Sequence, residues 1–420
     1  MTRRWRVPAG VSDAAARDWS TVESTPLHTP LFPWHQEHGG RIVDFAGWAM
    51  PVQYDSIVTE HLAARQAAGL FDVSHMGRLM IVGPAATAWL EGLLTRRVAD
   101  LPVGRARYTL VTGVDPDAGS ATGAAAAPVI LDDALVTRFA DAENGAARYM
   151  LVVNASNRQR VVDWLQSRMP ETGVTLTDIS AATAMIAVQG PAVFAGTAAA
   201  ADANILRSIL SAETVAAVTA LPTYAATEAT IGGQPAMISR TGYTGEDGVE
   251  LVVDAAQAID VWERLLQAGA SQGVRPCGLG CRDTLRLEAA MPLYGHELNE
   301  RSNPFAIGLG LAINLEGRDF PGAAGFAASR ESLGQRRVGL QFESRRAARQ
   351  GDVVTTLDGN VCGEVTSGSF APTIGCGVAL AMVDGDEAST GTQLEVIVRQ
   401  SRLSARVVPL PFYRRPRQPH

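Results

Sequence analysis

The alternation of hydrophobic and polar residues predicts strands and amphipathic helices in a repeated order. Residues 151–155 form an apolar run that ends at a polar cap, and residues 161–165 continue as a helical pattern with a tryptophan on its apolar face. Residues 251–255 and 259–266 repeat this order, again with a tryptophan in the helical part. Upstream of each unit, an apolar run ends at Gly-Pro, at residues 83–84 and 190–191. Two related α+β units explain the pattern, although strand–turn–helix segments also recur by chance.

The pattern changes beyond residue 335. Short apolar runs alternate there with the turn dipeptides Asp358-Gly359, Ser367-Gly368 and Asp384-Gly385, a spacing that favours a small antiparallel barrel or sandwich. Residues 303–322 are predicted to connect this part to the preceding units. The segment 113–127 consists mainly of small residues that cannot bury enough surface to order themselves, so we expect a mobile loop between two strands.

Composition removes several classes of function. The chain has 420 residues and a formal net charge of −7, which suggests two or three domains. All 36 basic residues are arginine, which excludes a pyridoxal Schiff base, a lysine nucleophile and a phosphate-binding loop that ends in lysine. The apolar stretches are shorter than the roughly 18 to 20 residues that span a bilayer, and the negative charge argues against a nucleic-acid partner. The four cysteines lack a common zinc spacing, so we expect reduced thiols and no metal.

Two adjacent acids are the first candidates for chemistry. Asp132 and Asp133 interrupt the apolar residues 129–136, which read as a strand. A carboxylate on an apolar face is costly unless it is paired or faces a cavity. The pair therefore indicates either a general acid or base, or an anchor for a cationic or NH-bearing ligand. The alternative is an acid pair that only marks the end of the preceding loop.

Further candidates follow in a glycine-rich acidic segment and in a predicted helix. Tyr243 can stack on a flat ring, and Glu250 can accept from paired NH donors. Arg282 and Arg286 fall on one helical face and form a possible carboxylate clamp. An acidic hairpin without function and a solvated helix with internal ion pairs explain the same residues. His75 precedes a strand and could line a cleft, but a lone histidine is more often structural.

Taken together, these segments resemble the aminomethyltransferase (T-protein) family of the glycine cleavage system. The matching strings occur in the family's order from residue 25 to about residue 415, and they lie at residues 25–27, 43–48, 71–76, 131–133, 187–191, 241–248, 278–289, 293–295, 319–320 and 365–375. The resemblance implies an α+β fold, a three-domain cloverleaf of two related ferredoxin-like α+β domains and a C-terminal antiparallel β-barrel. Residues 1–25 would be a flexible extension, 26–300 two interleaved folate-binding domains, 301–334 a connection and 335–415 the barrel.

The resemblance also implies a reaction and its partners. In this family the methylene carbon of an aminomethyl group, carried on the lipoyl arm of H-protein, passes to tetrahydrofolate as co-substrate. The products are 5,10-methylenetetrahydrofolate, ammonia and dihydrolipoyl H-protein, and the expected location is the cytoplasm, with no metal or pyridoxal phosphate. The alternatives are a folate-dependent demethylase of a small methylated substrate and a folate-binding paralogue with altered activity. Accessory proteins of this fold carry a K-G-C motif, which a chain without lysine cannot contain.

The family's functional positions transfer to individual residues of this chain. The catalytic aspartate corresponds to Asp132. The folate-binding positions correspond to Glu250, Arg282, Tyr243, Tyr108, Met76 and Arg415, with Arg414 as the alternative to Arg415. Two departures stand beside the match. Extra residues occur within 113–127, where they could obstruct the site, and Thr137 stands where relatives often have tyrosine.

Overall fold

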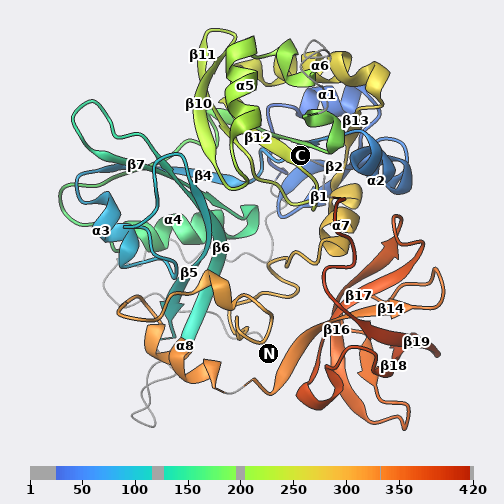
Figure 1. The fold of residues 1–420 in the computed structure, drawn as a ribbon. Coiled ribbons are helices and arrows are strands. Elements are labelled where there is room, and N and C mark those ends of the chain that lie inside the picture. Colours follow the sequence, from blue (N-terminus) through green and yellow to red (C-terminus); the bar gives the residue numbers. More distant parts are fainter. Residues whose placement is uncertain (1–24, 116–126, 195–203, 332, 417–420) are drawn as a thin grey trace.

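Three bodies meet around a common centre in the computed structural model of this chain (Figure 1). Two of them combine a sheet with helices, and the third is a β-barrel. The structure describes residues 25–115, 127–194, 204–331 and 333–416. The predicted N-terminal extension lies outside the described residues except for Thr25, and so does most of the predicted loop 113–127.

The first body is built on a five-stranded sheet. Its strands lie in the order β5-β6-β7-β4-β8, with bounds β4 Gly77–Gly83, β5 Ala106–Val114, β6 Pro128–Phe139, β7 Ala147–Val153 and β8 Thr175–Asp178. Helices α3 (Ala86–Glu91) and α4 (Arg158–Gln166) belong to this body. Leu90 and Trp164 pack from these helices against strand residues such as Leu79 and Leu151, which forms a core.

The second body is built on a six-stranded sheet in the order β10-β11-β12-β9-β3-β13. The bounds are β3 Gly69–Asp72, β9 Thr183–Gln189, β10 Ala226–Ile231, β11 Gln234–Ser239, β12 Gly248–Asp254 and β13 Arg275–Cys277. Its helices are α1 (Phe32–Glu37), α5 (Ala212–Ala220) and α6 (Ala258–Gly269). Because β3 precedes the first body in sequence but pairs within the second sheet, the two bodies are interleaved along the chain.

The internal repeat is confirmed as a structural repeat. Strand β4 pairs antiparallel with β7, and β9 pairs in the same way with β12. After β7 and β12 the chain makes a short 3-10 turn and enters α4 or α6, whose tryptophans, Trp164 and Trp262, are buried. The upstream strands β4 and β9 both stop at a glycine with positive φ, Gly83 and Gly190, where a side chain would collide with backbone oxygens.

The C-terminal body is a closed barrel of six strands in the order β14-β17-β16-β15-β18-β19. Their bounds are β14 Gln335–Phe342, β15 Val353–Thr355, β16 Val361–Ala371, β17 Cys376–Asp384, β18 Gln393–Val398 and β19 Ser401–Val408. Asp358-Gly359 lies in a turn as predicted, and Asp384-Gly385 ends β17. The turn predicted at Ser367-Gly368 is wrong, because both residues lie inside β16. Glycine is needed there since a Cβ at Gly368 would lie 2.4 Å from the carbonyl oxygen of Ala348.

Three further helices lie between the bodies, and a hairpin lies beside them. Helix α8 (Ala323–Arg330) packs Phe326 against Leu110 and Ile130 of the first sheet. Helix α7 (Leu279–Glu288) packs between helix α2 (Ile57–Gln66), the hairpin of β1 (Arg41–Phe45) and β2 (Trp48–Gln53), and barrel strand β16. Within the described residues, no helix combines the length and apolarity needed to cross a membrane.

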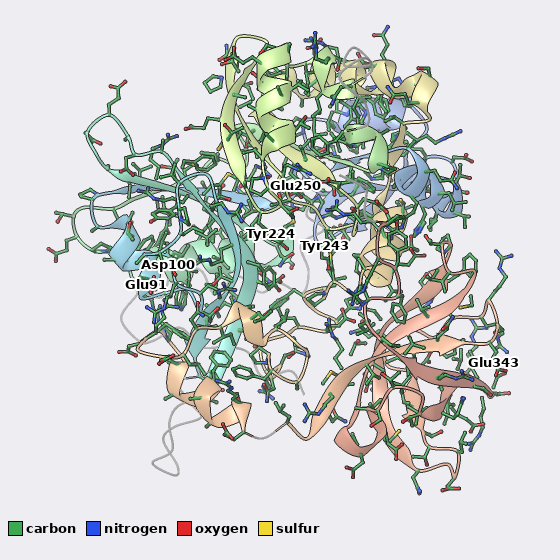
Figure 2. All side chains as sticks on the ribbon, viewed as in Figure 1. Glu91, Asp100, Tyr224, Tyr243, Glu250 and Glu343 are labelled. Atoms are coloured by element: carbon green, nitrogen blue, oxygen red, sulfur yellow. The ribbon has the colours of Figure 1, made fainter. Side chains whose placement is uncertain are left out.

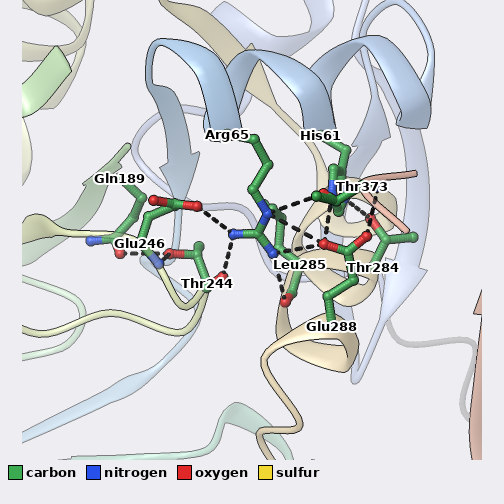
Figure 3. Close-up of polar contacts among 9 residues, drawn as sticks. All are labelled: His61, Arg65, Gln189, Thr244, Glu246, Thr284, Leu285, Glu288 and Thr373. Carbon is green, nitrogen blue, oxygen red and sulfur yellow. Dashed lines mark hydrogen bonds and ion pairs between the residues drawn. The ribbon is translucent and has the colours of Figure 1, made fainter. Parts of the chain in front are cut away.

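A buried ion network ties α2, α7 and the barrel together (Figure 3). Arg65 on α2 donates to the carbonyl oxygen of Thr244 at 2.7 Å and pairs with Glu246 at 2.9 Å and with Glu288 of α7 at 3.0 Å. The other carboxylate oxygen of Glu288 accepts from the backbone N–H of Thr373, in the barrel, at 2.9 Å. One guanidinium therefore fixes the position of the loop that carries Tyr243 and of α7.

Replacing Arg65 by alanine leaves Glu246 and Glu288 buried without this cation. We expect the free energy of unfolding to fall by about 3 to 5 kcal/mol, because an uncompensated buried charge is strongly unfavourable. Denaturant unfolding measures this loss. Arg402→Ala is the matched control, because Arg402 pairs with Glu395 but its side chain is 54% exposed, and its loss should stay within about 0.5 kcal/mol. Equal losses in both variants would show that the network does not hold this junction.

Candidate functional site

A cavity of about 530 Å³ lies where the bodies meet. Its walls come from the β1–β2 hairpin, strands β5, β6 and β12, the loop before β12, helix α7 and residues 291–296. Figure 2 places Tyr224, Tyr243 and Glu250 together in this central region. Most of the lining residues are aromatic or aliphatic, and a few polar groups stand among them, which is the usual composition of a site for a small organic ligand.

The structure brings together five of the seven residues predicted for the site. These are Glu250, Arg282, Tyr243, Tyr108 and Met76, which all line the cavity. They come from four separate stretches of sequence, and only tertiary packing makes them neighbours. Asp132 and Arg415 are not among the lining residues.

Glu250 and Arg282 bring opposite charges to the same cavity from different elements. Glu250 lies on β12, where it accepts a hydrogen bond from the Thr241 hydroxyl, and burial raises the pKa of its carboxyl. Arg282 lies on α7 with its guanidinium 5.1 Å from the centre of the Tyr243 ring. Its Nη1 is buried and has no hydrogen-bond partner among the described residues. A buried donor without a partner is unfavourable, so this side of the cavity is suited to a ligand that offers an acceptor.

Arg286 does not join Arg282 in the predicted clamp. It pairs instead with Glu297 at 3.0 Å and donates to the hydroxyl of Ser367, in the barrel, at 2.9 Å. Both charged side chains are almost fully buried. The second arginine of the helix therefore fastens α7 to the barrel and leaves the cavity to Arg282.

The acid pair splits between the two sides of the first sheet. Asp133 lines the cavity, where it accepts from the Tyr108 hydroxyl at 3.0 Å and from the side-chain amide of Asn154 at 2.8 Å. Asp132 accepts from the backbone N–H of Asn154 at 2.8 Å and from the amide of Asn157 at 2.6 Å, at the start of the turn that leads into α4. Successive residues of a strand face opposite sides, which accounts for the division.

Burial raises the pKa of both carboxyls, and the neighbouring Asp133 raises that of Asp132 further. The pair therefore keeps a proton to higher pH than an ordinary aspartate, which suits proton transfer near neutral pH. The sequence assigned the catalytic role to Asp132, whereas the structure places Asp133 against the cavity. The role of Asp132 stays a prediction.

Arg415 lies away from the cavity. Its side chain is 40% exposed and its Nη1 lies 3.3 Å from a carboxylate oxygen of Asp247. The ligand contact predicted for it therefore stays a prediction without geometric support.

Several lining residues were not predicted as ligand contacts. Phe45 and Ala46 reach the cavity from the tip of the β1–β2 hairpin, where Ala46 takes a left-handed conformation with φ of +52°. Asn154 and Tyr224 also line it. Asn154 was visible in the sequence only as the polar cap that ends the repeated strand, and Tyr224 belongs to none of the matching strings.

His75 lines the cavity and is almost completely buried. Burial lowers the pKa of its imidazole to about 4; the nearby Arg282 and Arg78 lower it further, and Asp72 opposes the shift. The ring is therefore neutral at physiological pH. Its Nδ1 has no hydrogen-bond partner among the residues that the structure describes.

One group of possible metal ligands lies elsewhere. Glu60, Cys277 and Cys281 are buried with their ligand atoms within 4.8 Å of one another. The Glu60 carboxylate already accepts from the backbone N–H groups of Tyr54 and Gly278 at 2.6 and 2.8 Å. This carboxylate is thus committed to holding the start of α7 against the β2–α2 loop, and the pair of sulfurs alone is not a typical zinc site.

Fold and site together define a class: a chain of two interleaved α+β bodies and a barrel around a central cavity lined by aromatic, aliphatic and charged side chains. Comparison with known families identifies the particular family. Residues 31–317 match the GCVT N-terminal domain, and residues 335–414 match the glycine cleavage T-protein C-terminal barrel domain. The chain belongs to the glycine cleavage T-protein family, as the sequence strings indicated.

Individual relatives support this placement over nearly the whole chain. The aminomethyltransferase of Streptomyces avermitilis is 43% identical over 398 residues, which cover 93% of this chain and 99% of the relative. That of Symbiobacterium thermophilum is 41% identical over 394 residues, which cover 92% of this chain and 97% of the relative. The crystal structure of glycine cleavage system aminomethyltransferase T from Bartonella henselae superposes with a TM-score of 0.78 at 32% identity. The match covers 93% of this chain and 98% of that structure's chain. These names do not favour the demethylase alternative.

The neutral state of His75 makes stability depend on pH. The unfolded chain binds a proton at this imidazole below about pH 6.5, whereas the folded protein does so only near pH 4. The unfolded state therefore binds more protons in this window. The free energy of unfolding is fully retained above pH 6.5 and falls by about 3 kcal/mol as the pH is lowered to 4.

His75→Phe is the variant that isolates this effect, because phenylalanine keeps the ring and removes the titration. Denaturant unfolding of both proteins at neutral pH and at about pH 4.5 should show that the wild type loses stability relative to the variant. A difference between the two proteins that does not change with pH would contradict the assignment.

Proposed function

We propose that this chain is the aminomethyltransferase of a glycine cleavage system. It transfers the methylene carbon of the aminomethyl group on lipoylated H-protein to tetrahydrofolate. The observation that carries the proposal is the convergence of Glu250, Arg282 and Asp133 on one buried cavity in a chain of the T-protein family. The cavity is lined by carboxylates, a guanidinium and aromatic rings, which matches the chemistry of a reduced pterin.

The polar groups of the cavity fit this co-substrate. A pterin ring offers adjacent N–H donors together with acceptor atoms. Glu250 can accept from N–H groups, and the unpartnered Nη1 of Arg282 can donate to an acceptor. Tyr108 and Tyr243 supply aromatic walls for the flat ring system.

The reaction breaks the bonds from the methylene carbon to sulfur and to nitrogen and forms two bonds to folate nitrogens. Two protons leave the folate nitrogens, and they end on ammonia and on the thiol of the lipoyl arm. Asp133 is the carboxyl group placed to take up and deliver protons in the cavity, with Tyr108 and Asn154 holding its two oxygens. Asp132 holds Asn154 from the opposite side and so positions Asp133.

The lipoylated H-protein is proposed as the partner and the cytoplasm as the location. All four cysteines are free thiols in the structure, and Cys277 and Cys281 stay unpaired although their sulfurs lie within 4.8 Å. Free thiols are typical of a reducing compartment.

Replacing Asp133 by asparagine keeps the size of the side chain and removes its proton transfer. We expect kcat for ammonia release from aminomethylated H-protein and tetrahydrofolate to fall roughly a hundredfold or more, while the affinity for reduced folate changes little. Asp132→Asn should mainly lower stability, because its new amide group faces the N–H donors of Asn154 and Asn157. The opposite result, with rate lost in Asp132→Asn and kept in Asp133→Asn, would support the assignment made from sequence.

Replacing Glu250 or Arg282 by glutamine should weaken binding of reduced folate. Each removes one charge-assisted hydrogen bond, so we expect roughly a ten- to hundredfold loss of affinity, measured by calorimetry with 5-formyltetrahydrofolate. Arg402→Gln serves as the control for an arginine outside the cavity, and we expect its affinity to stay near that of the wild type. Unchanged affinity in both cavity variants would reject this cavity as the folate site.

A further inference from the structure

The cavity holds a buried histidine that differs from the other buried histidines of the chain. In His35, Nε2 lies 2.9 Å from an Asp72 oxygen and Nδ1 lies 2.8 Å from the Tyr54 hydroxyl. In His61, Nδ1 lies 2.8 Å from the Thr284 hydroxyl and Nε2 contacts Glu288. These two rings are structural, because both nitrogens of each are engaged by the protein.

His75 has no such partners. Neither of its ring nitrogens makes a hydrogen bond within the described part of the chain, and Nδ1 is completely buried. Among the described residues its only ring contact is with Phe45, whose ring centre lies 5.5 Å away in an edge-to-face arrangement. A buried polar atom without a partner costs about 1 to 3 kcal/mol, so a purely structural histidine is not expected here.

The charged groups near His75 supply no partner for its ring within the described part of the chain. Asp72 of β3 is close enough to influence the ring, but its two oxygens already accept from His35, from the Thr29 hydroxyl at 2.6 Å and from the N–H of Ser74 at 2.9 Å. Arg78 of β4 and Arg282 of α7 act against a positive charge on the ring. A neutral imidazole carries one N–H donor and one acceptor nitrogen.

We propose that His75 is a further ligand-binding residue, whose neutral ring hydrogen-bonds the reduced pterin in the same cavity as Glu250 and Arg282. The inference rests on the proposed function, since it names the pterin as the occupant. A neutral group suits this position, because Arg282 already supplies the positive charge and Glu250 the negative charge. His75 adds a contact that depends on hydrogen-bond direction and carries no charge.

The test compares binding of 5-formyltetrahydrofolate to the full-length wild type, His75→Phe and His75→Gln by calorimetry at neutral pH. One neutral hydrogen bond corresponds to roughly a three- to tenfold change in affinity, so we expect His75→Phe to bind that much more weakly. We expect His75→Gln, which keeps a donor and an acceptor, to recover part of the loss. His28→Phe is the matched control, because His28 stacks on Phe32 outside the cavity and should leave affinity unchanged.

Stability separates a binding role from a structural one. Removing an unpartnered buried polar group does not lower the free energy of unfolding, so His75→Phe should bind folate more weakly while it unfolds no more easily than the wild type at neutral pH. Loss of stability and affinity together in both His75 variants would overturn the proposal. So would unchanged affinity in both variants.

Failure of the proposed function gives a different experimental result from failure of the His75 inference. If the wild type itself does not bind 5-formyltetrahydrofolate, the proposed function fails together with this inference. If the wild type binds and both His75 variants bind equally well, the function stands and only the role of His75 is rejected.

Discussion

The structure depends on the burial of three charged side chains of helix α7 in three different directions. Arg282 faces the cavity, Arg286 pairs with Glu297 next to the barrel, and Glu288 pairs with Arg65 of α2. Each charge would be strongly unfavourable in the interior without its partner, so the helix has few acceptable positions. The cavity has a defined shape because this helix is fixed against both α2 and the barrel.

Only the charge that faces the cavity is left without full compensation. Arg286 and Glu288 are paired by the protein, whereas a buried donor of Arg282 and a ring nitrogen of His75 have no partner among the described residues. Polar groups of this kind lower the stability of the empty protein, and they are retained where a ligand satisfies them. Both of these unpaired groups belong to residues that line the same cavity, an observation that supports the proposed site and does not depend on any likeness to relatives.

The acid pair shows what a strand pattern predicts and what it leaves open. Two adjacent acids in an apolar strand must face opposite sides, so the sequence predicted that one of them faces a cavity or a partner. The strand pattern did not decide which, and the family resemblance pointed to Asp132. The pairing of β5 with β6 shifts register at Val111 and Thr112, opposite this part of β6. The local irregularity, together with Asn154 and Asn157, turned Asp132 towards the helix side and Asp133 towards the cavity.

The sequence by itself determined the elements and the family. Hydrophobic periodicity and turn residues directly encode local patterns. These patterns include the repeated strand–helix order, the change to short apolar runs beyond residue 335 and the matching strings. The sequence also predicted that Glu250, Arg282 and two tyrosines share one site, and the structure brings them to one cavity. Only the tertiary structure decided that Asp133 faces the cavity, that Arg286 binds the barrel and that Gly368 lies within a strand. These outcomes depend on which surfaces come into contact, and contacts between residues far apart in sequence leave no periodic signal in it.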